Sequence, residues 1–184
     1  MQVAALPKYS PAELLDKVRE ALGPALESAE IRLGDPVIHA PVERLYEAIE
    51  KLKSHPDLDF AMLTSVTAVH WPHDAKEYEL VYHLRSLTHN LLLAVKSRVA
   101  RDEPAPSLTP LYKAADWQER EVWDLMGVKF EGHPDLRRIL MPEGYPWHPL
   151  RKEFTVGGPD FPIDAFQTDA HHQVREDEFW GEPG

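Results

Sequence analysis

The sequence predicts an α+β domain with two layers, in which helices pack on a largely antiparallel sheet, followed by a short helix and an extended C-terminal arm. Three observations lead to this fold class. Two amphipathic helical segments lie in the first third of the chain, three consecutive β-type segments follow them, and prolines crowd the last third. A chain of 184 residues is also long enough to bury a substantial core.

Two helices are expected before residue 56. Residues 10–22 begin with Ser10 as the N-cap, Pro11 in the first turn and Glu13 placed to complete a capping box. Residues 42–55 carry a second apolar stripe at helical spacing. Each helix therefore has one face that can cover a sheet.

The strands are expected between and after these helices. Residues 29–40 alternate apolar and polar around a Gly-Asp-Pro break at residues 34–36, which predicts a hairpin. Residues 58–71, 77–87 and 90–99 are rich in β-branched, leucine and aromatic side chains, and short turn-type segments separate them. We expect these three segments to form antiparallel strands.

The composition divides the chain into three parts. Residues 1–103 form the α+β core domain, and residues 104–140 form a proline-rich loop and a helix. Residues 141–184 hold many prolines and glycines together with aromatic residues, and they end in an acidic tail. Disordered segments are normally poor in aromatic residues. We therefore expect 141–184 to be an extended arm that binds a partner.

Composition excludes several classes of function. The chain has no cysteine, so thiolate zinc sites, cysteine nucleophiles and all-cysteine iron-sulfur clusters are excluded. The formal net charge of -11 disfavours binding to nucleic acid. No apolar run is long enough for a membrane span, and the N-terminal residues lack the pattern of a secretory signal. We expect a cytoplasmic location without a direct membrane span.

A short helix is expected at residues 114–126, ended by Gly127. One arc of this helix is apolar, and the opposite arc carries charged residues, with Asp116 and Arg120 spaced for an ion pair. Such an arc is usually solvated, but Trp117 and Trp123 lie outside the apolar arc, and large exposed aromatics are typical of contact surfaces.

The segment EREVWDLMGVKFEGHPDLRRILMPEGYPWHPLRKEF, residues 119–154, resembles the signature of the 30 kDa subunit family of complex I, the respiratory NADH:quinone oxidoreductase. The resemblance covers about a fifth of the chain and many separate positions. It departs from the family at Trp147, where relatives often have glycine, and at Glu153, where aspartate is usual.

The resemblance implies a structural subunit that binds no cofactor itself and is non-catalytic when isolated. FMN and iron-sulfur clusters are then expected in other subunits of a proton-translocating complex that transfers electrons from NADH to quinone. The implied partners are chiefly the quinone-site subunit and the terminal-cluster subunit. The implied location is peripheral, on the cytoplasmic side of the bacterial cell membrane.

The resemblance and the exposed tryptophans together predict a partner interface. Arginine suits such a role because its planar guanidinium can bind a partner carboxylate with two hydrogen bonds. The predicted interface residues are Trp117, Glu119, Arg120, Glu121, Asp124, His133, Arg137, Arg138, Tyr145, Trp147, His148, Arg151, Lys152 and Phe154.

Three alternatives remain open. Related subunits occur in membrane-bound hydrogenases and other quinone-reducing complexes, and the motif hardly separates them. A histidine-ligated metal enzyme would use His70 and His73, His133, or His171 and His172 beside Asp169, although the HExxH arrangement is absent. A stand-alone binding module would use the acidic tail as a tether to its partner.

Overall fold

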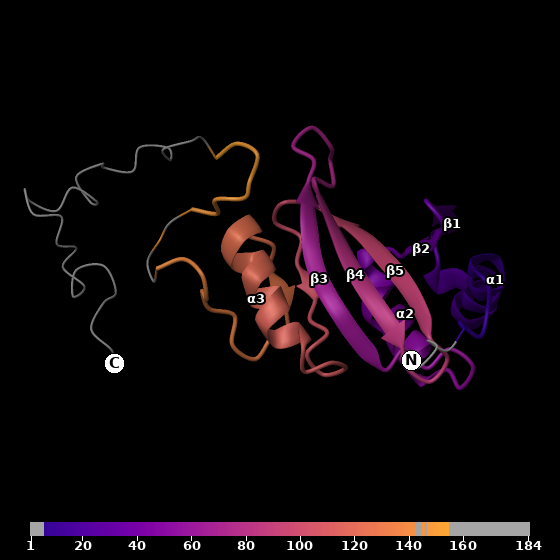
Figure 1. The fold of residues 1–184 in the computed structure, drawn as a ribbon. Coiled ribbons are helices and arrows are strands. Elements are labelled where there is room, and N and C mark those ends of the chain that lie inside the picture. Colours follow the sequence, from indigo (N-terminus) through magenta and orange to yellow (C-terminus); the bar gives the residue numbers. More distant parts are fainter. Residues whose placement is uncertain (1–5, 143–144, 146, 155–184) are drawn as a thin grey trace, which may run out of the picture.

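The computed structural model describes residues 6–142, 145 and 147–154. Figure 1 shows the order of elements along the chain. The helices are α1 (Pro11–Leu22), α2 (Leu45–Ser54) and α3 (Ala115–Met126), with 3-10 turns at Gly23–Ala25 and Val42–Arg44. The strands are β1 (Ser28–Arg32), β2 (Asp35–His39), β3 (Met62–His70), β4 (Tyr78–Ser86), β5 (Leu91–Val99), β6 (Ala105–Pro106) and β7 (Phe130–Glu131).

The main sheet has five strands in the order β1-β2-β5-β4-β3. Neighbouring strands are antiparallel except β2 and β5, which pair in parallel with Val37 opposite Ala94. The α+β class and the largely antiparallel sheet are therefore confirmed. The parallel pair arises because α2, β3 and β4 intervene between β2 and β5 along the chain.

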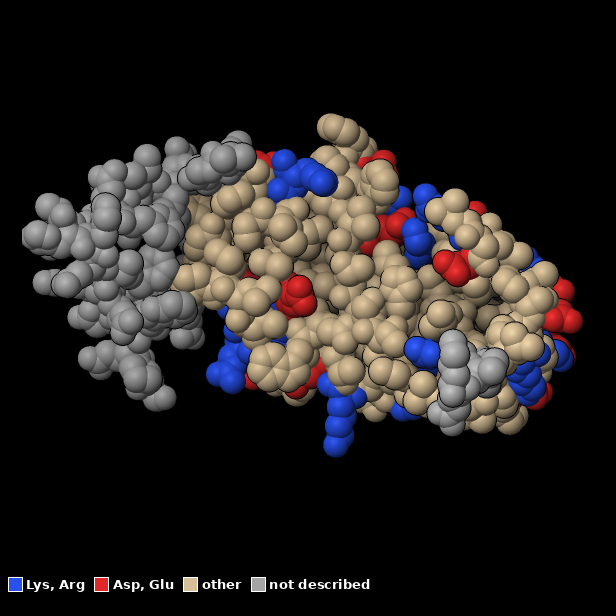
Figure 2. All heavy atoms as spheres, in the orientation of Figure 1, with Lys and Arg blue, Asp and Glu red and all other residues tan. Residues whose placement is uncertain are grey.

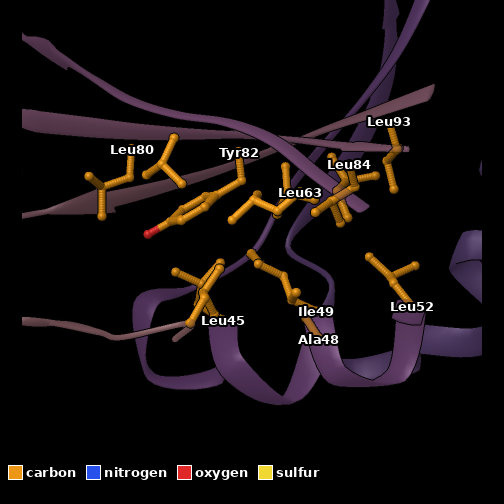
Figure 3. Packing of buried hydrophobic residues seen from close by; sticks show 14 of the residues in the cluster. Leu45, Ala48, Ile49, Leu52, Leu63, Leu80, Tyr82, Leu84 and Leu93 are labelled. Atoms are coloured by element: carbon orange, nitrogen blue, oxygen red, sulfur yellow. The ribbon is translucent and has the colours of Figure 1, made fainter. Parts of the chain in front are cut away.

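The core lies between this sheet and the helices α1 and α2. Figure 3 shows the buried side chains of α2, Leu45, Ala48, Ile49 and Leu52, directed at one face of the sheet. They face Leu63, Leu80, Tyr82, Leu84 and Leu93. Four apolar residues of α1 are also buried: Leu14, Leu15, Val18 and Leu22. The predicted capping box is present, because the Ser10 side chain accepts from the backbone of Glu13 and the Glu13 side chain accepts from the backbone of Ser10.

The hairpin between β1 and β2 turns one residue earlier than the Gly-Asp-Pro break suggests. Leu33 and Gly34 occupy the turn with φ of 53° and 97°, so Pro36 lies inside β2. Proline is tolerated there because its missing N–H falls at a position where the parallel pairing with β5 has not yet begun.

Helix α3 lies at the end of the sheet away from α1 and beside the edge strand β3 (Figure 1). The side-chain oxygen of Gln118 on α3 accepts the N–H of Val66 on β3, so the helix satisfies part of the open strand edge.

The proline-rich segment after residue 101, expected to be a loop, contains a short strand. β6 pairs in parallel with β7, and the N–H groups of Ala105 and Ser107 donate to the backbone carbonyls of Lys129 and Glu131. Pro106 lies between these two donors, where no N–H is required, so a two-residue strand interrupts a segment that otherwise has no helix or strand before α3.

Among the residues that the structure describes, no helix combines the length and the apolar character needed to cross a membrane.

Candidate functional site

Asp124 is the centre of the region that carries the signature. Its side chain is fully buried, because the segment after β7 folds back over that face of α3. One carboxylate oxygen accepts the N–H groups of Ile139, Leu140 and Met141 at 3.0, 2.8 and 2.9 Å. Burial alone would raise the pKa of Asp124, but these three donors and the Arg138 guanidinium hold that pKa below its usual range.

Arg138 supplies the charge opposite Asp124. Its guanidinium donates to the other carboxylate oxygen and to the backbone carbonyl of Asp124, and also to the carbonyl of Trp147. The same guanidinium lies over the rings of Trp123 and Tyr145, at 5.4 and 5.7 Å from their centres. Arg138 therefore joins α3 to two separate positions of the following chain.

The end of α3 receives the next part of the chain. Gly127 has φ of 79°, and a Cβ there would overlap the Arg151 guanidinium and lie 2.7 Å from the His148 ring. Arg151 donates to the carbonyl of Met126, and His148 Nδ1 donates to the carbonyl of Asp124. Burial lowers the pKa of His148, which favours the neutral ring in this position. Glycine is thus required both for the backbone turn and for the close approach.

Arg120 and His133 hold the start of the same segment. The Arg120 guanidinium donates to the carbonyls of Arg137 and Arg138. His133 Nδ1 accepts the N–H of Asp135, so its Nε2 carries the proton and donates to the carbonyl of Asp116. The ion pair expected between Asp116 and Arg120 does not form. The Arg120 guanidinium is bonded instead to the carbonyls of Arg137 and Arg138.

Glu119 lies on the inner side of α3 and is fully buried. Its carboxyl oxygens accept the Ser107 hydroxyl and the N–H of Leu108, both at 2.7 Å. No cation contacts it among the described residues. Burial raises the pKa of Glu119 to about 7. The Ser107 hydroxyl is also 2.8 Å from the Thr109 hydroxyl, so it can reverse: it then donates to Thr109 and its oxygen accepts a hydrogen bond from the O–H of neutral Glu119.

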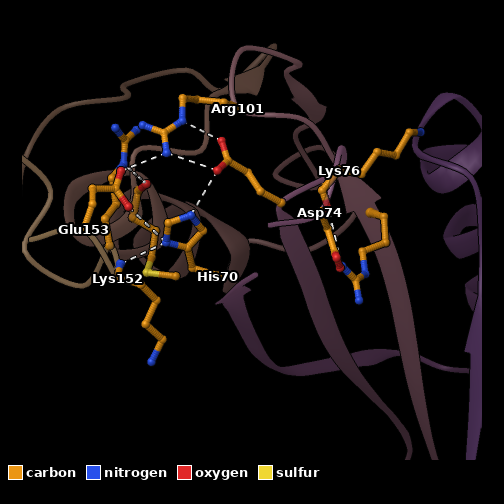
Figure 4. A network of polar contacts seen from close by, with 10 residues as sticks. His70, Asp74, Lys76, Arg101, Lys152 and Glu153 are labelled. Atoms are coloured by element: carbon orange, nitrogen blue, oxygen red, sulfur yellow. Dashed lines mark hydrogen bonds and ion pairs between the residues drawn. The ribbon is translucent and has the colours of Figure 1, made fainter. Parts of the chain in front are cut away.

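A polar network ties the last described residues to the sheet (Figure 4). His70, at the end of β3, is buried, and its Nδ1 accepts the N–H of Lys152 at 2.9 Å. Its Nε2 must then carry the proton, and it lies 3.1 Å from Glu77. Arg101 bridges Glu77 and Glu153. The Arg101 guanidinium, together with His70, lowers the pKa of Glu77 to about 2.

These contacts sort the predicted interface residues into two groups. The buried or partly buried group includes Glu119, Arg120, Asp124, His133, Arg138, His148 and Arg151, whose polar atoms bond within the chain. The outward group includes Trp117, Glu121, Arg137 and Lys152. Glu119 and Asp124 occupy internal positions because the chain after β7 and the loop before α3 cover them. A role in partner contact stays a prediction for both groups.

The remaining predicted residues lie along the arm. Tyr145 and Trp147 contact each other edge to face, with ring centres 5.6 Å apart, and the Phe154 N–H donates to the carbonyl of Arg151. Residues 147–154 thus pack on their own chain, through α3 and His70, while residues 155–184 lie outside the described part. The division of the chain at residues 104 and 141 stays a prediction, although contacts cross both boundaries.

Sequence reasoning missed several members of the site. Ser107 and Leu108 hold Glu119, and His70 holds Lys152 across 82 positions of sequence. His70 was considered as a metal ligand and not as an acceptor of a backbone N–H. The described residues contain no group of three His, Cys, Asp or Glu side chains placed to hold a metal ion. His171, His172 and Asp169 lie outside the described residues.

Comparisons with known proteins agree on one family. The model of the family "Respiratory-chain NADH dehydrogenase, 30 Kd subunit" matches residues 38–160. The chain is 41% identical to the NADH-quinone oxidoreductase C subunit of Agrobacterium fabrum, over 79% of this chain and 73% of that protein. It is 39% identical to the corresponding protein of a Caulobacter species, over 83% of this chain and 72% of that protein.

Two solved structures are similar in fold. One is the trypsin-resistant fragment (1-134) of Nqo5, with a TM-score of 0.58, 28% identity, and 68% of this chain and 98% of that chain covered. The other belongs to the membrane-bound sulfane sulfur reductase, an archaeal respiratory membrane complex. Its TM-score is 0.66 and its identity 26%, with 79% of this chain and 85% of that chain covered.

Proposed function

This chain belongs to the family of the 30 kDa subunit of respiratory-chain NADH dehydrogenase, and on that premise we propose that it is a structural subunit that docks on its neighbours through the surface of α3. We call this surface the α3 platform; it comprises α3 with residues 135–142, 145 and 147–154. The chain is a subunit of an NADH-quinone oxidoreductase complex of the respiratory chain.

The observation that carries the proposal is the organisation around Asp124. A buried carboxylate that accepts three consecutive N–H groups and an arginine fixes a segment that has no helix or strand of its own. Leaving one partner of a buried charge pair unpaired costs about 3–5 kcal/mol. Irregular backbone held this firmly is suited to present side chains in one fixed geometry.

The outward side of the platform has the chemistry of a contact surface. Trp117, Leu140 and Leu150 are 64%, 58% and 56% exposed. Arg137 is also outward, with its guanidinium 2.9 Å from Asp135 at the surface. Tryptophan and arginine are enriched among the residues that dominate binding energy at interfaces. Covering the exposed leucines with a partner would stabilise the complex, because it removes apolar surface from water.

The role we propose is positional. Electron transfer between cofactors depends on their being held at fixed separations, so a rigid protein can assist it by fixing its neighbours. We propose that the neighbours are the quinone-site subunit and the terminal-cluster subunit, on the cytoplasmic side of the membrane. FMN and iron-sulfur clusters then reside in other subunits, and the isolated chain has no turnover.

A related complex is the second candidate. The likeness to a chain of an archaeal membrane-bound sulfane sulfur reductase supports use of the same platform outside NADH oxidation. The identities of about 40% to proteins of NADH-quinone oxidoreductases favour the NADH-oxidising complex.

Recovery of the tagged chain from native membranes tests the proposal. We expect flavin- and cluster-containing subunits to be recovered with it, and we expect Arg137→Ala and Arg151→Ala to lower that recovery. Turnover per assembled complex should be unchanged in both variants. Recovery of the chain alone, or normal assembly with lost turnover, would contradict the proposal.

A further inference from the structure

Among the described residues, no helix covers one face of the main sheet. Helices α1 and α2 pack on the face formed by residues such as Leu91, Leu93 and Val95 of β5. The alternate residues of the same strands lie on the other face, which Figure 2 presents with wide uncharged areas between scattered charged groups. Register places Val37 beside Ala94 on this face, and Ala94 beside His83.

This helix-free face is hollowed at its centre. A cavity of about 490 Å³ crosses β3, β4, β5 and β2, and it is lined largely by apolar atoms. Val37 and Val81 form part of its lining and are only 5% and 8% exposed, although no helix of the described part of the chain lies over them. Leu92 and Met62, at 54% and 43% exposed, stand beside Arg85 on the same face. The floor of the hollow is therefore formed by apolar side chains that are largely shielded from solvent, and the exposed side chain of Leu92 makes one side apolar as well.

The charges around the hollow are mainly positive. Arg32 lines it and Arg85 stands beside it, and neither has an ionic partner among the described residues. Lys96 also lines it but is neutralised by Glu79 at 2.8 Å. Asp35 is the carboxylate in the lining. Two unpaired arginines beside an apolar hollow stand out in a chain whose formal net charge is -11.

We propose that this face is a second docking surface, which binds an extended segment of another subunit that carries apolar side chains flanked by Asp or Glu. The apolar side chains would fill the hollow and cover Leu92 and Met62, and the carboxylates would pair with Arg32 and Arg85. The proposal is independent of the α3 platform, which lies across β3 at the sheet edge.

The charges argue against other occupants. A second copy of this chain in a symmetric contact would supply one lining carboxylate, Asp35, against the two arginines Arg32 and Arg85, so the charges would not balance. Two arginines are too few to hold nucleic acid against the acidic remainder of the chain. A small apolar molecule inside the hollow would leave Met62, which lies outside the lining, still exposed to water.

Two charge substitutions test this proposal in the assembled complex. Leu92→Glu and Arg85→Glu change exposed side chains, so both variants should unfold at the wild-type denaturant midpoint. We expect the amount of each variant incorporated into the purified complex to fall at least tenfold. Leu87→Glu is the matched control, because Leu87 is 64% exposed but lies in the β4–β5 turn outside the hollow. Incorporation of Leu92→Glu equal to that of Leu87→Glu would overturn the proposal.

A photo-crosslinking residue at position 92 identifies the occupant. In the assembled complex we expect a crosslink to an apolar and acidic segment of another subunit. A crosslink to a second copy, to residues 155–184 of this chain, or to nothing would overturn the proposal. Trp117→Ala assayed in parallel separates the two surfaces, since it disturbs the α3 platform and leaves the hollow intact.

Discussion

At the scale of single residues, the site depends on two carboxyl groups of α3 that the fold treats differently. Asp124 is ionised, because three N–H groups and Arg138 compensate for its burial. Glu119 has two neutral donors and no cation among the described residues, and burial raises its pKa to about 7. Both side chains are removed from water on opposite sides of one helix, and the number and charge of their donors decide the protonation state.

Glu119 predicts a specific pH dependence of stability. Its pKa is raised on folding from an ordinary 4.5 to about 7, so its contribution to stability is complete below pH 4.5 and is lost as pH rises through 7. Glu119→Gln keeps a neutral donor and acceptor, so it should remove this dependence. The difference in unfolding free energy between wild type and variant should change by on the order of 3 kcal/mol from pH 5 to pH 8, with the variant relatively more stable at pH 8. A constant difference across that range would refute the assignment.

At the scale of elements, α3 shows what a helical wheel can and cannot predict. Its bounds, its stop at Gly127 and the burial of Ala115 and Val122 follow from the local pattern. The opposite arc was expected to be solvated or to contact a partner, yet Asp124 is buried there. The segment that covers it begins about 15 residues later, and nothing in the helix itself encodes that cover.

The contact between α3 and the arm yields a prediction with a built-in control. Gly127 and Gly132 have nearly equal φ of 79° and 80°, but a Cβ would meet Arg151 and His148 only at Gly127. Gly132→Ala should therefore cost about 1–2 kcal/mol of unfolding free energy from backbone strain alone. Gly127→Ala should cost about 1 kcal/mol more, because the added Cβ overpacks against the His148 ring and moves the Arg151 guanidinium from the carbonyl of Met126. Equal losses in denaturant unfolding would show that the arm contributes nothing there.

At the scale of the whole molecule, sequence patterns predicted the layers better than the long-range connections. The three long strands and both core helices lie where periodicity indicated them. The parallel pair of β2 and β5, the β6–β7 pair and the bond from Lys152 to His70 join segments far apart in sequence. Periodicity reports which side of an element is buried, and it carries no information about which distant segment buries it.

The contrast between the α+β core and the C-terminal arm predicts the course of proteolysis of the isolated chain. We expect trypsin to cut first after residue 141 while the α+β core persists, and to cut at Arg175 before Arg151 and Lys152, because Arg151 is bonded to Met126 and Lys152 to His70. The trypsin-resistant fragment of the similar Nqo5 structure is consistent with a resistant core in that relative. Mass spectrometry of the early fragments checks this prediction. Equally rapid cuts within β3, β4 or β5 would count against it.

The most direct test of the central claim is the loss of one exposed side chain from the α3 platform. Trp117 lies under Arg120 at 5.0 Å, and Trp71 makes a comparable contact with Arg98 at 5.5 Å in the β3–β4 turn, in a segment that is not part of the platform. Incorporation of Trp117→Ala and Trp71→Ala into the complex, and NADH:quinone turnover per assembled complex, are measured together. We predict that Trp117→Ala weakens incorporation by about 30-fold, equivalent to about 2 kcal/mol, with normal turnover per complex, and that Trp71→Ala does not. Normal incorporation of Trp117→Ala together with lost turnover would contradict a positional role.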